Sequence, residues 1–293
     1  MRRSLYALRR WLPIIGLLMS ALLLSACSAN RLGYQHAPTL IYYWLDSYFD
    51  FDGPQGVAVK DSLRELQSWH RREELPLLAD LLKNLQAPAL QDVSADQICT
   101  LWAYVQERLQ APLNPLAPTL ATTAASLKPA QLQHIEAEFA RRNKKWREEW
   151  LDPSATERAT NRSRQIIDRT EQFYGRLDDS QRELIRQQVL ASGYDPELQQ
   201  REMLRRQQDS LQTLARLRSG TFTSEKARME IQDLFARALA SPEPAVRQYT
   251  ASMTRSLCAG VAAVHNSSSA AQRAKLVKTL QTYEADARAL MQG

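Results

Sequence analysis

The stretch SLRELQSWHRREELPLLADLLKNL, residues 62–85, carries apolar side chains at helical spacing along its whole length. Most of these side chains have another one three or four positions away, and Leu77 follows Trp69 by about two helical turns, as on one face of an α-helix; they are Leu63, Leu66, Trp69, Leu77, Leu78, Leu81, Leu82 and Leu85. Pro76 interrupts the stripe and is expected to kink or restart the helix, because proline has no amide donor. The stretch therefore predicts helix, and the alternation of a half-buried strand is absent.

The rest of the chain also predicts helices. It is rich in Leu, Ala, Gln, Arg and Glu, which are good helix formers, and glycine occurs only nine times in 293 residues. A short buried helix is expected over 39–52, and the later helices are expected over 129–151, 154–175, 179–192, 196–218, 224–240, 243–265 and 269–291. The fold class expected is all-α, an irregular multi-helix array or bundle of about eight or nine helices.

Proline suggests how the chain is divided. Residues 111–128 hold three prolines among alanines and threonines, and Pro129 follows, a composition typical of a linker or long loop. The division predicts an N-terminal helical lobe over 38–110 and a C-terminal helical lobe over 129–293.

The beginning of the chain has the layout of a secretory signal. Four arginines precede an apolar run of 14 residues, too short to cross a bilayer core of about 30 Å as a permanent helix. Leu24-Ser25-Ala26-Cys27 then resembles the lipobox of bacterial lipoproteins. The resemblance implies a signal peptide over 1–26, cleavage before Cys27, a lipid on the Cys27 sulfur, and a polar tether over 27–37. The alternatives are a plain signal peptide or an uncleaved anchor.

The lipoprotein resemblance also bears on location and charge. In the enterobacterial sorting rule, Asp after the lipidated cysteine retains a lipoprotein at the inner membrane, so Ser28 implies the outer membrane, on its periplasmic side. The chain has 38 basic and 32 acidic residues, and loss of the four signal arginines would leave 34 basic residues and a net charge of +2. No nucleic-acid partner is indicated. The expected partners are the membrane, through lipid on Cys27, and an unidentified envelope protein.

Cys99 and Cys258 are the two cysteines that a mature chain would retain. An oxidising compartment favours a disulfide between them. Such a bridge would close a loop of about 160 residues, which the chain-entropy model values at about 5 kcal/mol. The alternative is a pair of buried free thiols, which behave as small apolar side chains.

Several predicted helix starts share a cap-x-x-Gln pattern. The cap oxygen accepts from an unpaired backbone N–H, and the glutamine accepts from the N–H of the cap residue. The pattern occurs at Asp52–Gln55, Ser94–Gln97, Asp178–Gln181 and Ser269–Gln272, and Lys128 takes the cap position before Gln131. Its irregular spacing indicates a helix-start device and not a solenoid repeat. The Leu127-x-x-x-Gln131 frame resembles the Leu-Thr-x-x-Gln motif of small periplasmic stress chaperones.

Longer motifs carry a second resemblance. They are Tyr43-Trp44-Leu45-Asp46-Ser47-Tyr48-Phe49-Asp50-Phe51, Trp69-His70-Arg71-Arg72-Glu73-Glu74-Leu75-Pro76, and Gln272-Arg273 near the start of the last helix. Together they are similar to an uncharacterised proteobacterial lipoprotein family, known only as a domain of unknown function. The resemblance covers most of the mature chain. It implies a helical lipoprotein of the periplasm or outer membrane, and it implies no activity.

Motifs for catalysis and metal binding are absent from the sequence. His36, His70, His134 and His265 are too far apart for a His-x-x-x-His zinc pair, and no Glu-x-x-His motif of a di-metal bundle occurs. The nucleophile elbow, the P-loop and the dinucleotide-binding loop are missing too. We therefore expect no metal, no cofactor and no enzymatic activity.

Two charged stretches are candidate interaction surfaces. The first comprises His70, Arg71, Arg72, Glu73 and Glu74, and the second comprises Arg141, Lys144 and Lys145. The first would be a recognition surface beside the proline, and the second would contact anionic lipid head groups. In both cases the alternative is a solvated helix face with its aromatic neighbours turned inward.

The function expected is that of a lipid-anchored periplasmic protein of the Gram-negative outer membrane, non-enzymatic, which binds proteins or supports the envelope. One alternative is a chaperone-like helical cradle for envelope proteins, which requires a large, partly apolar concave surface. Another is a cell-wall hydrolase, which requires a cleft with two converging carboxylates.

Overall fold

The computed structural model describes residues 30–220 and 222–292. Within these ranges the chain forms eleven α-helices from residue 37 onward, a helical stretch over 30–35, one 3-10 helix and no strand. The elements are α2 Ala37–Phe49, α3 Gly53–Leu85, η1 Pro88–Leu90, α4 Ala95–Gln110, α5 Leu113–Ser126, α6 Pro129–Trp150, α7 Ala155–Tyr174, α8 Asp179–Ala191, α9 Pro196–Arg218, α10 Ser224–Leu239, α11 Pro244–Asn266 and α12 Ala270–Leu290. The all-α class is confirmed, and the expected eight or nine helices are too few.

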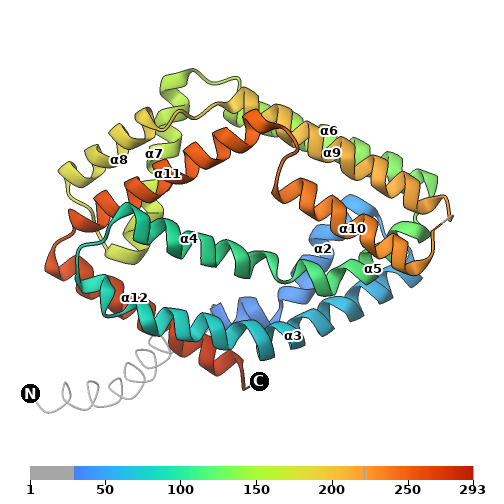
Figure 1. Ribbon diagram of the computed structural model, residues 1–293, viewed down its shortest axis with the longest axis horizontal. Helices are drawn as coiled ribbons and strands as arrows, with labels where there is room; N and C mark the ends of the chain where they lie inside the picture. The colour runs from blue at the N-terminus through green and yellow to red at the C-terminus, as the bar shows by residue number, and fades with distance from the viewer. Residues whose placement is uncertain (1–29, 221, 293) are drawn as a thin grey trace, which may run out of the picture.

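The helices form an elongated ring (Figure 1). α3 and α12 run along one long side, α6 and α9 lie together on the opposite side, and α5 and α10 pack at one end. α7 and α8 lie at the other end, while α4 lies inside the outline and contacts α11. Buried apolar residues form four separate clusters, which suits a ring better than one continuous core.

α3 continues through Pro76 as one helix of 33 residues, so the expected restart at this proline is wrong. Proline removes one backbone hydrogen bond, but burial of the residues beside it stabilises the helix on both sides. Leu75 and Ala79 are buried against Ala287 and Leu290 of α12. Tertiary packing therefore outweighs the local cost of the proline.

The linker or loop expected over 111–128 is wrong, because these residues form α5. Two of the prolines stand at the N-cap and in the first turn, where a missing N–H breaks no helical bond. Ala117, Ala121 and Ala124 are buried, and their small side chains let α5 lie close to α9 and α10. α3 with α12 and α4 with α11 also pack together, so helices of the two predicted lobes contact each other.

A disulfide joins α4 to α11. Cys99 and Cys258 are bonded, with their Cα atoms 5.3 Å apart, which confirms the predicted pairing. Cys258 is fully buried. The bond connects residues 159 apart in sequence, so it links the inner helix of the ring to its wall.

The ends of the ring are held by pairs of glutamines. In the first pair, Gln55 at the start of α3 meets Gln131 at the start of α6, and each side-chain amide donates to the other's carbonyl oxygen at 3.3 and 2.7 Å. Gln55 also donates to Ser126 O at 3.0 Å, and Gln131 donates to Asp50 O at 2.8 Å. Both glutamines are buried.

The second pair repeats this geometry at the other end of the ring (Figure 1). Gln181 of α8 and Gln272 of α12 exchange amide hydrogen bonds of 2.9 Å each way. Gln181 donates to Ser267 O at 3.1 Å, and Gln272 donates to Arg176 O at 3.0 Å. In both pairs each glutamine also accepts from its own cap N–H, so both amide hydrogens and both lone pairs are used.

These pairs explain why the cap-x-x-Gln pattern recurs. Gln97 of α4 makes only the local capping box with Ser94, and it is exposed. The four paired glutamines make the same local cap and in addition join two helix starts. The sequence therefore showed the cap, while the pairing required the tertiary structure.

Removal of the disulfide should destabilise the fold. Replacing both Cys99 and Cys258 by alanine is expected to lower the free energy of unfolding by about 4 kcal/mol, because the open chain gains entropy when unfolded. Urea unfolding with and without reductant measures the change, and the double variant should not respond to reductant. Equal stability of the oxidised protein and the variant would contradict the expectation.

The glutamine pairs provide a second prediction. Gln181→Glu retains the cap bond but replaces the donor to Ser267 O by an acceptor. It should therefore lower the free energy of unfolding by about 2–3 kcal/mol. Gln97→Glu is the matched control, since glutamate serves equally well in an exposed capping box. Urea unfolding of both variants gives the comparison. If both glutamates have the same effect, the pair adds nothing to the local cap.

Candidate functional site

The first described residues are docked on the ring. Residues 30–35 are helical, and Arg31 Nε lies 2.7 Å from Asp286 Oδ1 of α12. Asn30 Nδ2 lies 3.4 Å from the other oxygen of this carboxylate, which is only 3% exposed. A buried carboxylate needs such a partner. The expected tether is therefore wrong from residue 30 onward, whereas Cys27 and Ser28 lie outside the described residues.

Tyr34 docks the same segment onto α3. Its hydroxyl lies 3.0 Å from His70 Nδ1, and its backbone carbonyl accepts a hydrogen bond from Gln67. The guanidinium of Arg71 lies 5.7 Å from the centre of the Tyr34 ring. Burial lowers the pKa of His70, although the nearby Glu74 carboxylate acts in the opposite direction. In the neutral tautomer that carries its hydrogen on Nε2, His70 Nδ1 accepts a hydrogen bond from the Tyr34 hydroxyl, and protonation of Nδ1 removes that acceptor.

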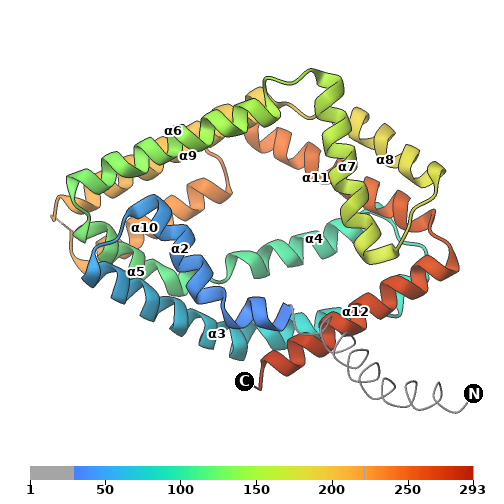
Figure 2. The same ribbon diagram turned by 180° about the vertical axis from the view of Figure 1, so that it is seen from behind.

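α2 has one packed face and one exposed face. Tyr42 is buried against Val59 and Leu63 of α3, and the Tyr42 hydroxyl lies where a side chain at Gly56 would have to be. Figure 2 shows α2 on the near side of the ring, where it contacts both α3 and α6. The short helix predicted over 39–52 is therefore confirmed as a helix, but only one of its faces is buried.

The exposed face of α2 is aromatic and uncharged. Leu40 is 59% exposed, Tyr43 64% and Trp44 55%, and their spacing places them on one stripe. His36 precedes them and Ser47 follows on the same face, both exposed. Leu32 in the docked segment is 55% exposed as well. We call Leu32, Leu40, Tyr43 and Trp44 the aromatic stripe. The spacing was readable in the sequence, but exposure required the fold.

The first predicted charged surface is divided by the structure. His70 and Arg71 are half-buried beneath Tyr34, and Glu74 is buried with its Oε1 3.5 Å from Arg108 Nη1 of α4. Only Arg72 and Glu73 are exposed. The five residues therefore do not form one recognition surface, because the docked segment and α4 cover part of the set.

The second predicted surface is exposed on α6, but partly neutralised. Arg141 makes a bidentate pair with Glu138, with distances of 2.8 and 2.6 Å, and these hydrogen bonds lower the pKa of Glu138 to about 2. Lys144 Nζ lies 4.0 Å from Glu148, and Lys145 is exposed. Contact of this face with lipid head groups stays a prediction.

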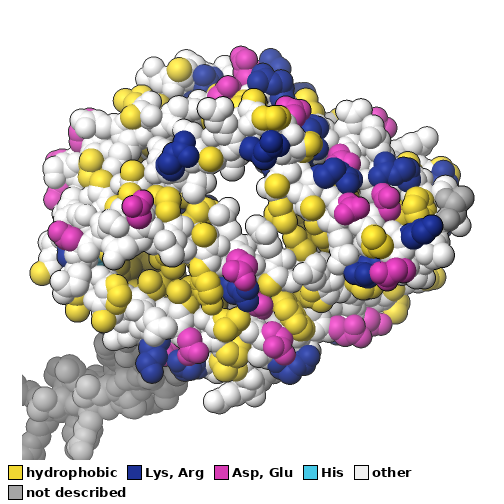
Figure 3. All heavy atoms as spheres, in the orientation of Figure 1, with side chains coloured by type: hydrophobic (Ala, Val, Ile, Leu, Met, Phe, Trp, Pro, Cys, Tyr) yellow, Lys and Arg dark blue, Asp and Glu magenta, His cyan; other side chains and the backbone are white. Residues whose placement is uncertain are grey.

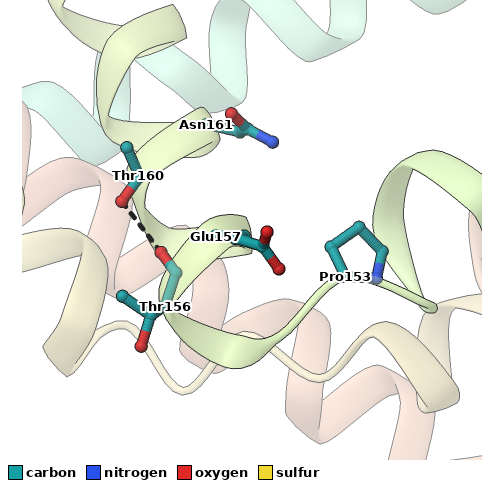
Figure 4. A pocket seen from close by; sticks show the side chains of 5 residues that line it. All are labelled: Pro153, Thr156, Glu157, Thr160 and Asn161. Atoms are coloured by element: carbon teal, nitrogen blue, oxygen red, sulfur yellow. Dashed lines mark hydrogen bonds between the residues drawn. The ribbon is translucent and has the colours of Figure 1, made fainter.

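Two shallow clefts flank α7. Figure 4 shows the first, of about 290 Å³, lined by Pro153, Thr156, Glu157, Thr160 and Asn161. Glu157 accepts from the Ser154 hydroxyl at 2.8 Å and from the Ser154 N–H at 2.9 Å, and these two hydrogen bonds lower the pKa of Glu157. Thr160 donates to the Thr156 carbonyl at 2.9 Å. The second cleft contains no carboxylate at all. Neither cleft presents two converging carboxylates.

The described residues contain no group of His, Cys, Asp and Glu arranged to hold a metal. His265 is buried and structural: its Nδ1 lies 2.8 Å from the Tyr174 hydroxyl and its Nε2 lies 2.7 Å from Gln91 O. Burial raises the pKa of Tyr174 to about 12. These contacts join α7, α11 and the segment before α4.

Over the described ranges, no helix is long and apolar enough to span a bilayer. The described residues form a helical ring, and the segment 30–35 docks on the last helix beside an aromatic stripe. The chain belongs to DUF6279, a family of unknown function, whose model matches residues 47–243. No curated protein and no solved structure matches the chain. The match confirms the resemblance to an uncharacterised domain family, while the lipobox and chaperone resemblances stay predictions.

Docking of the N-terminal segment should depend on pH. The pKa of His70 is lowered in the folded protein, so the neutral ring contributes stability above its unfolded pKa, and this contribution is lost as the pH falls through the folded value. Wild type should lose more stability between pH 7.5 and 5.0 than His70→Gln. Exposed His134 provides the control variant His134→Gln, and urea unfolding measures each. Parallel pH profiles for wild type and His70→Gln would argue against the expectation.

Proposed function

We propose that this protein is a lipid-anchored periplasmic protein of the Gram-negative outer membrane, non-enzymatic, which presents a helical ring to other envelope proteins. The observation that carries the proposal is the aromatic stripe beside the docked N-terminal segment. The aromatic stripe would face the membrane, and it follows soon after the stretch 24–27 that resembles a lipobox. Ser28 supports the outer membrane as the destination.

The short distance between Cys27 and the ring supports an orientation in which the aromatic stripe faces the membrane. Only Ser28 and Ala29 lie between Cys27 and Asn30, so an extended chain would place these two residues at most about 10 Å apart. Arg31 is held by Asp286, which leaves no long tether between lipid and ring. Acyl chains on Cys27 would therefore bring the docked segment and α2 to the head groups.

The chemistry of the stripe matches a bilayer interface. Tyr and Trp are enriched where head groups meet acyl chains, because their rings are apolar and carry one polar group. Leu32, Leu40, Tyr43 and Trp44 carry no charge that insertion would have to desolvate. Insertion of the aromatic stripe would add to the membrane affinity that the acyl chains provide. Stable anchoring generally requires two such contributions.

A chaperone-like helical cradle is the alternative function. Figure 3 shows an opening through the ring with hydrophobic side chains around it. Large apolar side chains are exposed on most of the described helices, among them Leu109, Leu190, Leu204 and Met229. In-cell crosslinking separates the two functions, because an adaptor yields one stoichiometric partner and a chaperone yields many precursors. For a cell-wall hydrolase, by contrast, neither described cleft provides the carboxylate pair.

The membrane attachment is tested on the native protein. Mass spectrometry of protein purified from membranes should find an acylated Cys27 at the new N-terminus. In phosphatidylethanolamine and phosphatidylglycerol vesicles with bromine near the head groups, tryptophan fluorescence should be quenched. Trp44→Phe should remove at least half of this quenching, because bromine acts at short range on the exposed ring.

Trp102→Phe is the control, since Trp102 belongs to α4 inside the ring outline. It should leave the quenched fraction unchanged. An unmodified Cys27 thiol would refute the lipid anchor. An acylated Cys27 with no effect of Trp44→Phe would refute the orientation alone.

A further inference from the structure

The second cleft beside α7 combines aromatic side chains with an arginine. It measures about 330 Å³ and lies where α6, α7, α9 and α11 meet. Its lining consists of Trp146, Trp150, Arg162, Gln165, Ile166, Tyr194, Gln199 and Met253. None of these is acidic. A volume of this size accommodates a large side chain and a few polar atoms of a ligand.

Arg162 is the charged group of the cleft. Its guanidinium lies 4.0 Å from the centre of the Tyr194 ring, and Nη1 donates to Ser192 Oγ at 3.2 Å. Among the described residues, no carboxylate forms a salt bridge with it. Burial lowers the pKa of Arg162, although Coulombic interaction with Tyr194 and Tyr249 acts in the opposite direction. A half-buried guanidinium with free N–H donors favours an anion as its partner.

Arg158 adds a second cation one turn earlier in α7. Its Nη1 donates to the backbone carbonyls of Leu151 and Pro153. It too has no carboxylate partner within the described ranges. Two cations without a salt-bridge partner among the described residues therefore lie at the cleft, and the carboxylate that acts on its lining is Asp195, next to Tyr194.

Two amide side chains complete the lining. Gln165 and Gln199 are exposed, and their side chains make no hydrogen bond to another described residue. Each offers both a donor and an acceptor, as a peptide backbone requires. An acyl chain would leave them without partners, so the lining favours a peptide over a lipid.

We propose that this cleft binds the carboxy-terminal residue of a partner polypeptide. Its terminal carboxylate pairs with Arg162, its aromatic side chain packs between Trp146 and Trp150, and its last amide contacts Gln165 and Gln199. Planar carboxylate recognition and aromatic stacking are both typical of arginine beside aromatic rings. The site deepens the protein-binding role proposed above, but it does not depend on the lipid at Cys27.

The test uses a synthetic hexapeptide that ends in phenylalanine, prepared as the free acid and as the amide. Titration into the full mature chain is followed by tryptophan fluorescence, because Trp146 and Trp150 line the cleft. The free acid should bind at least tenfold more tightly than the amide. Arg162→Gln should reduce binding of the free acid to the level of the amide.

Arg164→Gln is the matched control, because Arg164 is exposed on the same helix and bonds Asn161 instead. It should bind both peptides like the wild type. Arg162→Lys keeps the charge and should give intermediate affinity, and circular dichroism should show that all variants are folded. Equal affinity for acid and amide, or full binding by Arg162→Gln, overturns the proposal.

Dodecyl phosphate provides the lipid comparison. If it binds more tightly than the free-acid peptide, the cleft belongs to a lipid and the proposal is overturned. Failure of the peptide titration with an acylated Cys27 would leave the membrane attachment standing and refute this site alone.

Discussion

At each end of the ring, two helix starts face each other and a pair of glutamines joins them; Gln55, Gln131 and Gln181 are buried and Gln272 is half-buried. In a ring the buried apolar residues are divided among separate small clusters. Hydrophobic burial, which is not directional, therefore specifies the pairing of distant helices less than it would in a protein with one continuous core. An amide pair is directional, and here every donor and acceptor of each glutamine is used. Gln55 with Gln131 and Gln181 with Gln272 therefore determine which helix starts can be neighbours. A carboxylate at any of these positions would place an acceptor against a backbone carbonyl.

The disulfide and the alanine-rich helix act between these ends. Cys99–Cys258 holds α4 against α11, where the described residues offer few large buried side chains. α5 is held against α9 and α10 by close packing, since Ala117 is fully buried and Ala121 nearly so. Short side chains bring backbones together, and the resulting contacts are numerous although each is weak. The opening in Figure 3 persists because the helices around it are held at such points and not by a filled centre.

The N-terminal segment links this architecture to the proposed membrane attachment. Asp286 is buried and accepts from Arg31, so release of the segment would leave a carboxylate without its partner. The same docking orients the aromatic stripe of α2 relative to the ring. The Trp146–Trp150 cleft lies on other helices, at the junction of α6 with α7, α9 and α11. Membrane contact and peptide binding are thus assigned to different elements of one ring.

The sequence alone determined the all-α class, the helices after residue 129 to within about two residues and the caps. It favoured the Cys99–Cys258 pairing over two free thiols, and the structure contains that bond. These follow from local periodicity, from proline and cap residues, and from the small number of cysteines. Only the tertiary structure decided that α3 passes through Pro76, that 113–126 is helical, and that Glu74 is buried while Trp44 is exposed. Each of these depends on which helix lies opposite, and residues far apart in the chain supply that neighbour. The glutamine pairs show the division most clearly, since one motif caps a helix locally and closes the ring only when a second copy faces it.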